Sequence, residues 1–357
     1  MKYKRIFRCT VAIVVFTIIF LAIQQLLTPK YVSELIHGNM IREYYTSAKD
    51  HNIIFIGDCE VFATFSPVVL WEDFGLTSFV RGSAQQLVWQ SYYMLEETLR
   101  IERPDVIVFS VLAMQYAEPQ SEAYNRLTLG GMRWSRSKVR AIQASRTYDE
   151  DFISYVFPLL RFKDRWREVG ADDFRYFFRR PQVTVNGFMI NAETRPPSDF
   201  SPPPLRRATY DFGEKPLYYL QKIADLAADN DIPLVLVKAP TLYPYWHDSW
   251  NMQIIDFAMK NNLRYINLLN YIYEVGLDFA VHTFDFGYTL NVFGAERVTR
   301  FFGEYLTSEF PLLPDRRGEA VTATHWNASA ARYHETIARQ LMEIDEYGAV
   351  QDFRVNR

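Results

Sequence analysis

Residues 52–67 read Asn-Ile-Ile-Phe-Ile-Gly-Asp-Cys-Glu-Val-Phe-Ala-Thr-Phe-Ser-Pro, and this stretch decides the fold. The run at 52–57 is short, apolar and rich in β-branched and aromatic side chains, and it ends on glycine, which is typical of a buried central strand. Ser66 and Pro67 have the pattern of an N-cap followed by a first-turn proline. The stretch therefore predicts a strand that leads, through a short connection, into a helix.

The same alternation continues along the chain. Alternating strands and helices predict a parallel sheet with helices on both faces. The expected further strands are residues 77–81, 104–111, 233–239 and 264–269, and the expected helices are residues 86–100, 216–230, 250–262, 294–306 and 327–347.

The alternation breaks between residues 117 and 210, where apolar runs are few and Arg, Trp and Phe are frequent. Within this segment we expect a helix at 151–169 and a proline-rich crossing at 198–204. The predicted organisation is a cytoplasmic tip and transmembrane signal anchor at 1–28, the first part of the α/β domain at 29–116, an insertion or lid at 117–210, the second part of the domain at 211–312, and a C-terminal helical tail at 313–357.

The N-terminus has the pattern of a membrane anchor. Basic residues at positions 2, 4, 5 and 8 precede an apolar run that reaches Leu27. Because about 20 residues cross a bilayer, and no small-x-small cleavage motif follows, we expect an uncleaved signal anchor through residues 6–27. The basic cluster favours a cytoplasmic N-terminus. The expected protein is a single-pass protein of the cell membrane with an extracytoplasmic main domain.

Composition and charge exclude several classes of function. A net charge of -3 provides no basic field for phosphates, so nucleic acid is not an expected partner. The chain has no cluster with metal-ligand spacing and no phosphate-binding glycine loop, and therefore no metal or cofactor is expected. Of the two cysteines, Cys9 lies in the membrane segment, which leaves Cys59 as the single thiol of the exported domain.

Ligands of open parallel sheets bind at the carboxyl ends of the strands. The predicted strands place residues 57–60, 82–83, Ser110, residues 239–240 and the loop at 285–291 at that edge. The candidate site is expected there.

These segments resemble the blocks of SGNH (GDSL-like) hydrolases. Residues 54–67 are similar to the first block, and Cys59 stands where the family has its nucleophilic serine. Residues 80–84 are similar to the second block, whose glycine, here Gly82, supplies an oxyanion-hole amide alongside the amide of Cys59. Residues 285–297 are similar to the last block, with Asp285 as the catalytic acid and Thr289 at the position of the histidine.

The resemblance implies a three-layer αβα fold with a flavodoxin-like parallel sheet, together with a largely helical insertion and an N-terminal transmembrane helix. The combination of blocks resembles envelope-associated members of the kind linked to polysaccharide O-acylation and to D-alanylation of teichoic acids. It therefore implies an esterase or acyltransferase that acts on a cell-envelope polysaccharide or polymer, alone or with a membrane acyl-transfer or export protein.

The sequence departs from the family pattern at three places. The nucleophile position holds Cys59, the histidine position holds Thr289, and the third block lacks its asparagine, for which Ser110 or Gln115 could substitute as an oxyanion donor. A thiol needs less help from a base than a hydroxyl does, and a helix that starts at Cys59 would lower its pKa further.

The residues on either side of Cys59 can oppose this effect. Asp58 and Glu60 would raise the thiol pKa if they point inward. In the alternative arrangement, Asp58 binds loop amides and Glu60 faces solvent.

A different histidine could replace the missing base. Of the six histidines, His282 is the preferred substitute because it precedes Asp285 by three residues, and His247 follows a strand on the correct side of the sheet. Each could equally be a surface or packing histidine. The others are His37, His51, His325 and His334.

Two aromatic regions could contact a glycan. The better placed is the tract at 241–250, where Tyr243, Tyr245, Trp246 and His247 should border the cleft. The other begins the insertion, around Asn125, Arg126, Arg133 and Trp134, with Trp166 further along. A structural role is the alternative for both.

Two functions remain open from the sequence. The first is an acyl esterase or acyltransferase with Cys59 as nucleophile, favoured by the presence of Cys59 and Asp285. The second is a catalytically impaired binding or assembly module for envelope polymer modification, favoured by the missing histidine.

Overall fold

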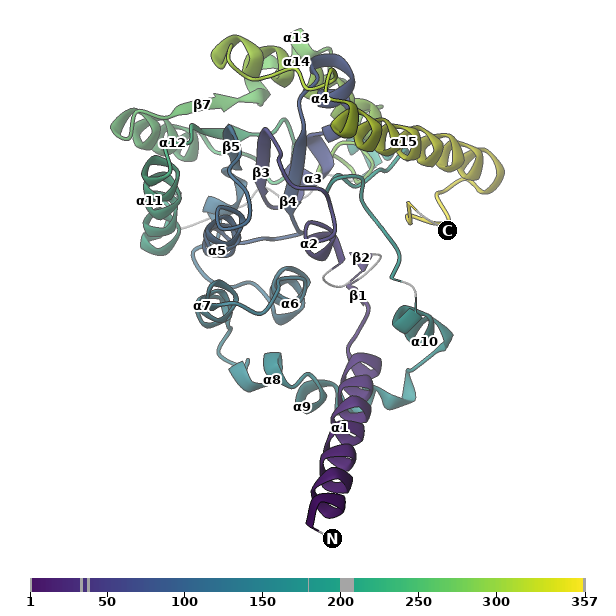
Figure 1. Cartoon of the computed structure of the whole chain (residues 1–357). Helices are drawn as coiled ribbons and strands as arrows, with labels where there is room; N and C mark the ends of the chain where they lie inside the picture. The colour runs from purple at the N-terminus through teal and green to yellow at the C-terminus, as the bar shows by residue number, and fades with distance from the viewer. Residues whose placement is uncertain (1, 33–34, 37–38, 179, 200–208, 356–357) are drawn as a thin grey trace.

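The computed structural model describes residues 2–32, 35–36, 39–178, 180–199 and 209–355. Its main feature is a parallel five-stranded sheet with the order β4-β3-β5-β6-β7 (Figure 1). Numbered within the sheet this order is 2-1-3-4-5, which is that of flavodoxin-like folds, so the predicted fold class is confirmed. The strands are β3 (Ile53–Gly57), β4 (Ser78–Gly82), β5 (Val106–Ser110), β6 (Leu234–Lys238) and β7 (Arg264–Asn267).

Helices cover both faces of the sheet. Ile107 and Phe109 of β5 pack with the apolar sides of α5, α11 and α12, whereas Val106 and Val108 point the other way and pack with α3, α4 and α14. This alternation along one strand explains why the predicted strands read as continuous apolar runs. The helices are α3 (Cys59–Thr64), α4 (Pro67–Phe74), α5 (Val88–Thr98), α11 (Glu214–Asp229), α12 (Asp248–Lys260) and α14 (Val292–Glu309).

The start of α4 follows the predicted capping pattern. The Ser66 side chain accepts a hydrogen bond from the amide of Val69, and Pro67 occupies the first turn. The remaining short elements are β1 (Tyr31–Val32), β2 (Leu35–Ile36), α2 (Asn39–Glu43), η1 (Leu112–Gln115), α6 (Glu122–Leu129), α7 (Arg136–Ser145), η3 (Pro197–Asp199), η4 (Leu268–Tyr271) and α13 (Ile272–Val275), and the chain closes with α15 (Ala320–Tyr347).

The single helix expected at 151–169 is wrong. The segment forms α8 (Phe152–Val156), α9 (Leu159–Phe162) and η2 (Lys163–Arg167) instead. The break falls at Pro158, which lacks an amide donor and disfavours helical geometry in the residue before it. Of the crossing expected at 198–204, residues 198 and 199 belong to η3, and the rest lies outside the described residues.

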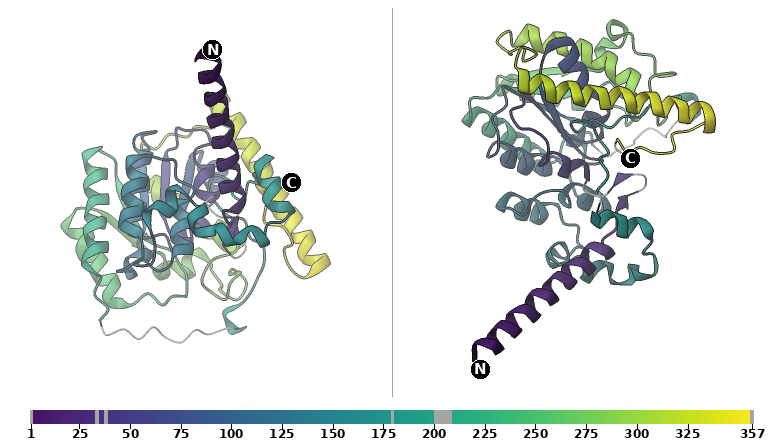
Figure 2. Two further views of the ribbon diagram at one scale, coloured as in Figure 1. Left: turned by 90° about the horizontal axis from the view of Figure 1, so that it is seen from below. Right: turned by 45° about the vertical axis from the view of Figure 1, so that its right-hand side comes forward.

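The N-terminal helix α1 (Lys2–Leu27) is long and apolar enough to cross a membrane. It projects from the rest of the chain (Figures 1 and 2). Its apolar side chains are exposed over most of its length. Its C-terminal end packs against α9, η2 and α10 (Ala171–Phe178). Arg165 ties this contact, since its guanidinium donates to the carbonyls of Leu26 at 3.1 Å and Thr28 at 3.3 Å.

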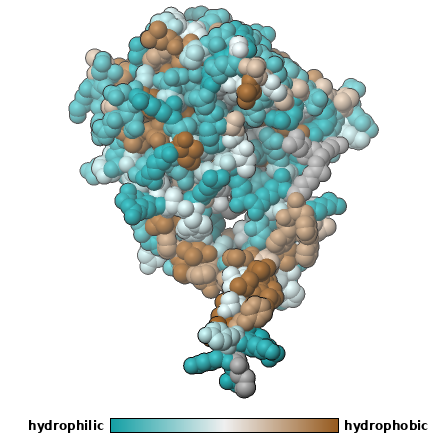
Figure 3. Space-filling view, viewed as in Figure 1, coloured by the Kyte–Doolittle hydropathy of each residue, from teal (hydrophilic) through white to brown (hydrophobic). Residues whose placement is uncertain are grey.

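We call residues 152–178 the collar because they surround the end of α1. Figure 3 shows hydrophobic residues gathered along α1 and on the collar beside it. The collar thus extends the apolar surface of α1 to the base of the α/β domain. Its exposed apolar side chains are Ile153, Phe157, Leu160, Trp166, Phe174, Phe177 and Phe178.

Candidate functional site

Cys59 is the first residue of α3 and follows the carboxyl end of β3 directly. Asp58 caps this helix, because its Oδ1 accepts a hydrogen bond from the amide of Glu60 at 3.1 Å. Gly57 and Gly82 let the ends of β3, β4 and β5 lie close together beside α3. A Cβ at Gly57 would lie 2.7 Å from the Cβ of Ser110, and a Cβ at Gly82 would lie 3.0 Å from the carbonyl oxygen of Asp58. The ends of β3, β4 and β5 can therefore meet only without side chains at these positions.

A buried ion pair lies directly behind Cys59. The carboxylate of Glu60 and the ammonium of Lys238 are both fully buried, and Lys238 Nζ lies 2.5 Å from Glu60 Oε1. Further hydrogen bonds satisfy the other donors of the Lys238 ammonium and the other acceptors of the Glu60 carboxylate. Lys238 also donates to the carbonyl of Ala239 and to Thr241 Oγ1, while Glu60 accepts from the hydroxyls of Thr241 and Ser110. This network joins α3 to the ends of β5 and β6, and so fixes the helix that carries Cys59.

The Glu60–Lys238 pair was not predicted from the sequence. The alternative in which Glu60 faces solvent is wrong, since its side chain is wholly buried. One signal was available, because Lys238 ends an apolar strand whose other residues are all buried. A lysine in that position needs a charged partner or must lose its proton.

The loop that carries Asp285 is held in a defined shape. A bridge between Thr283 and Leu290 closes it, and Gly287 adopts φ of +104°, which favours glycine. Thr289 donates to both carboxylate oxygens of Asp285, through its amide to Oδ1 and through its hydroxyl to Oδ2, each at 2.5 Å. Thr289 thus orients Asp285 and cannot act as a base itself.

The electrostatic environment of Cys59 is negative. Burial first, and then the charges of Asp58, Glu60 and Asp285, raise the pKa of the Cys59 thiol well above its ordinary value. The expectation that helix amides lower this pKa is therefore wrong in its net effect, because burial and, after it, the carboxylates outweigh them. Burial and the charge of Glu60 likewise raise the pKa of Asp58 well above its usual range. The thiol is protonated at neutral pH, so nucleophilic attack requires a base.

Asp285 is the titratable group best matched to that task. Burial raises the pKa of Asp285 to about 6, although hydrogen bonds from Thr289 and from nearby backbone amides oppose the shift. A carboxyl with this pKa is mostly ionised at neutral pH and still readily protonated. It can therefore accept a proton and return it within one reaction cycle.

The expected oxyanion donors differ in their availability. Gly82 lies against the backbone of Asp58. The hydroxyl of Ser110, however, donates to Glu60 Oε2 at 3.1 Å, so its proton is already used inside the ion-pair network. Gln115 is buried in η1.

The described histidines all have other partners. The ring Nδ1 of His282 accepts from the amide of Asp278, and burial together with the charge of Arg297 lowers its pKa. His247 caps α12 and stacks on Tyr210 at 3.7 Å between ring centroids. In the described part of the chain, no hydrogen bond joins a histidine ring to Cys59. His51 binds Glu102, His334 binds Glu72, His325 lies beside Trp326, and His37 lies outside the described residues.

The aromatic tract at 241–247 lies beside the Asp285 loop. The amides of Leu242 and Tyr243 both donate to the carbonyl of Gly287. The Tyr243 ring packs on Tyr245 and Tyr288, with centroids 4.9 Å and 5.5 Å away. Tyr245 is exposed, whereas Tyr243 is buried and Trp246 packs into Phe212 and Trp250. Of the predicted contact residues, Tyr245 has the most accessible ring.

No family model matches this chain, and no curated protein matches it either. Solved structures align with this chain, and among them are two GDSL-type proteins. A protein assigned to the lipolytic G-D-S-L family from Desulfitobacterium hafniense DCB-2 aligns over 71% of this chain and 99% of its own, with 9% identity and a TM-score of 0.37. A GDSL-like lipase from Bacteroides thetaiotaomicron VPI-5482 aligns over 76% of this chain and 99% of its own, with 12% identity and a TM-score of 0.37.

Proposed function

We propose that this chain is a membrane-anchored, extracytoplasmic acyl esterase or acyltransferase of the SGNH-like type, with Cys59 as nucleophile and Asp285 as base. The observation that carries the proposal is the coupling of these two groups. Asp285 has a pKa of about 6, its charge acts on the Cys59 thiol, and Thr289 holds its carboxylate in place. The pair can work without a histidine.

The reaction would proceed by two acyl transfers. The Cys59 sulfur attacks the ester carbonyl while the thiol proton passes to the Asp285 carboxylate, and the backbone amides of Cys59 and Gly82 stabilise the oxyanion. The ester C–O bond then breaks, and the leaving alkoxide takes the proton from Asp285. Water or an acceptor hydroxyl attacks the resulting thioester, Asp285 accepts its proton, and that proton returns to the Cys59 thiolate as it leaves.

The proposed substrate is a cell-envelope polysaccharide or polymer, and the proposed partner is a membrane acyl-transfer or export protein. The N-terminal helix supports the anchored location, since it would leave the bilayer where the collar meets the α/β domain. The exposed collar aromatics suit the membrane interface, where Trp and Phe are favourable. Tyr245 and Tyr288 beside Asp285 could stack on a sugar.

A second candidate function has its own support. The chain could be a binding or assembly module that keeps the cleft without efficient turnover. The raised pKa of the Cys59 thiol favours this reading, because reactive cysteines usually have lowered pKa values in electropositive surroundings.

Hydrolysis of 4-nitrophenyl acetate at pH 7.5 by the full chain in detergent distinguishes the acyl esterase or acyltransferase from the binding or assembly module. We expect Cys59→Ala to abolish the enzyme-dependent rate and to remove the acetyl adduct seen by intact mass spectrometry of the parent. Thr289→His should raise the rate by up to about 100-fold, because a histidine base would join Asp285. Cys9→Ala is the matched control, since it removes the chain's other thiol without touching the cleft.

Equal rates for the parent and Cys59→Ala, with no gain in Thr289→His, would exclude acyl transfer at this site. The binding module would then be the better description.

A further inference from the structure

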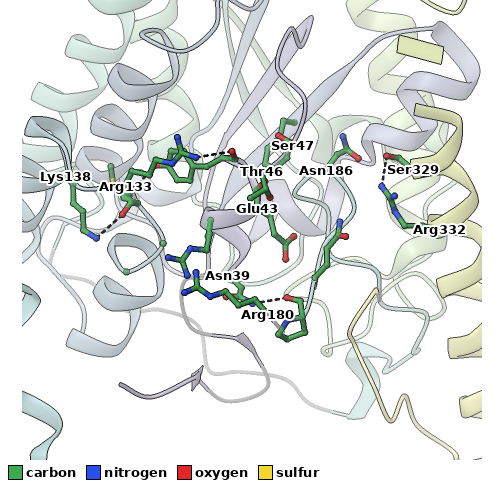
Figure 4. A pocket seen from close by; sticks show the side chains of 18 of the residues that line it. Asn39, Glu43, Thr46, Ser47, Arg133, Lys138, Arg180, Asn186, Ser329 and Arg332 are labelled. Carbon is green, nitrogen blue, oxygen red and sulfur yellow. Dashed lines mark hydrogen bonds between the residues drawn. The ribbon is translucent and has the colours of Figure 1, made fainter. Parts of the chain in front are cut away.

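A cavity of about 880 Å³ opens near the amino-terminal ends of β3 and β4, whereas Cys59 follows the carboxyl end of β3. Segments far apart in the sequence build its wall, including α2, the turn before α7, residues 180–182 and α15. Figure 4 shows Arg133 and Lys138 on one side of this cavity and Arg332 on the other, with Arg180 and Glu43 between them. The cavity is separate from the candidate catalytic site.

The cavity is rich in positive charge. Arginine and lysine side chains enter it from four segments, and none of them forms an ion pair within the described part of the chain. Lys138 is buried and Arg332 is half-buried, whereas Arg42, Arg133 and Arg180 are exposed at the cavity wall. The unpaired cations of the cavity are Arg42, Arg133, Lys138, Arg180 and Arg332.

The single carboxylate that lines the cavity does not neutralise these charges. Glu43 accepts hydrogen bonds from the amides of Val183 at 2.8 Å and Thr184 at 3.1 Å, and from the Thr184 hydroxyl. Burial raises the pKa of Glu43 to about 8, although these hydrogen bonds oppose the shift. At neutral pH the carboxyl is therefore largely protonated, and the cavity keeps a strong net positive charge.

Two of the cations are held in unfavourable surroundings. Lys138 is buried with one hydrogen bond to the carbonyl of Met132, and burial lowers its pKa to about 8, although the charge of Glu97 opposes the shift. Arg332 donates to Ser329, but its Nε is buried with no partner. A buried donor without an acceptor costs stability, so a bound anion would supply the acceptor that Arg332 Nε lacks.

From this geometry we propose that the cavity binds a phosphate group. Arginine forks recognise phosphate through two parallel hydrogen bonds, and several arginines can converge on one phosphate. The position points toward the membrane side, because residues 180–182 directly follow α10, which packs on α1. The phosphate could belong to an anionic lipid headgroup or to a free phosphate compound.

Titration calorimetry of the full chain in an uncharged detergent tests the proposal. The probes are dihexanoyl phosphatidylglycerol, dihexanoyl phosphatidylcholine and inorganic phosphate. We expect phosphatidylglycerol to bind more tightly than phosphatidylcholine, whose choline group the cations repel. Arg42→Gln/Arg180→Gln should weaken binding roughly 10-fold or more, since each charged hydrogen bond is worth about a factor of ten.

The matched control is Arg136→Gln/Arg140→Gln, which removes the same charge from exposed positions of α7 outside the cavity. Its binding should equal that of the parent. A single Arg133→Gln variant provides an independent test if the double variant unfolds at a lower temperature than the parent.

The probes also distinguish the source of the phosphate. Binding of phosphatidylglycerol alone indicates a lipid headgroup, and binding of inorganic phosphate with the same response to the variants indicates a soluble ligand. The proposal is overturned if neither probe binds, or if Arg42→Gln/Arg180→Gln and Arg133→Gln bind as the parent does. Because these variants lie away from Cys59, that failure would leave the proposed acyl transfer untouched.

Discussion

Replacing Lys238 with methionine should lower the free energy of unfolding by about 3–5 kcal/mol, because it leaves the Glu60 charge buried without its partner. The three hydrogen bonds donated by Lys238 Nζ are lost at the same time. Thermal and denaturant unfolding followed by tryptophan fluorescence would measure the change. This is the largest single-residue effect on stability that we expect in the α/β domain.

Two further variants test whether the unpaired Glu60 charge causes the loss of stability. Lys260→Met removes a lysine from an exposed position at the end of α12 and should change stability little. The double variant Glu60→Gln/Lys238→Met should recover part of the loss, since a neutral amide is less costly to bury than an unpaired carboxylate. A loss below about 1 kcal/mol in Lys238→Met would mean that the pair is not a strong constraint on α3.

Asp285→Asn should lower the rate of 4-nitrophenyl acetate hydrolysis by about 100-fold or more, as expected for the loss of a general base. The parent rate should rise with pH through about 6, where Asp285 ionises, and this step should vanish in the variant. The control Asp256→Asn changes an exposed carboxyl on α12 and should keep the parent profile. Retention of the pH step in Asp285→Asn would assign it to another group.

The same substitution should raise stability at neutral pH. Because burial lifts the pKa of Asp285 to about 6 from an ordinary value of 3.8, ionisation of Asp285 disfavours the folded state. Its favourable contribution is complete at low pH and is lost as the pH rises through 6. Asp285→Asn should therefore unfold at the parent's temperature near pH 4 and at a higher temperature at pH 7.5. A lower unfolding temperature at both pH values would assign Asp285 a structural role only.

Local sequence signals were sufficient to predict the parallel sheet and the helices that cover it. The strand at 52–57 and the cap formed by Ser66 and Pro67 depend on neighbouring residues, and both agree with the structure. Pro158 was an equally local signal, and the continuous helix expected at 151–169 ignored it. Predictions of this kind succeed because buried strands and helix caps are decided within a few residues.

The candidate site needed the three-dimensional structure. Glu60 and Lys238 are 178 positions apart, and no periodic pattern connects them. The pairing of Thr289 with Asp285 depends on a loop shape that the spacing alone does not specify. The direction of the Cys59 pKa shift depends first on burial and then on three carboxylates, of which the sequence indicated Asp58 and Glu60 but not Asp285. Packing and charge at long range therefore decide what this thiol can do.

The contact between α1 and the collar determines how the domain would be oriented relative to a bilayer that α1 spans. Arg165 donates to the carbonyls of Leu26 and Thr28 at the end of α1, and α10 packs on the same helix, so direct contacts join α1 to the collar. With α1 in a bilayer, Cys59 would stand at a fixed height and tilt above the membrane. The proposed polymer substrate would then have to pass at that height, because the reach of Cys59 would be decided by geometry and not by diffusion on a linker.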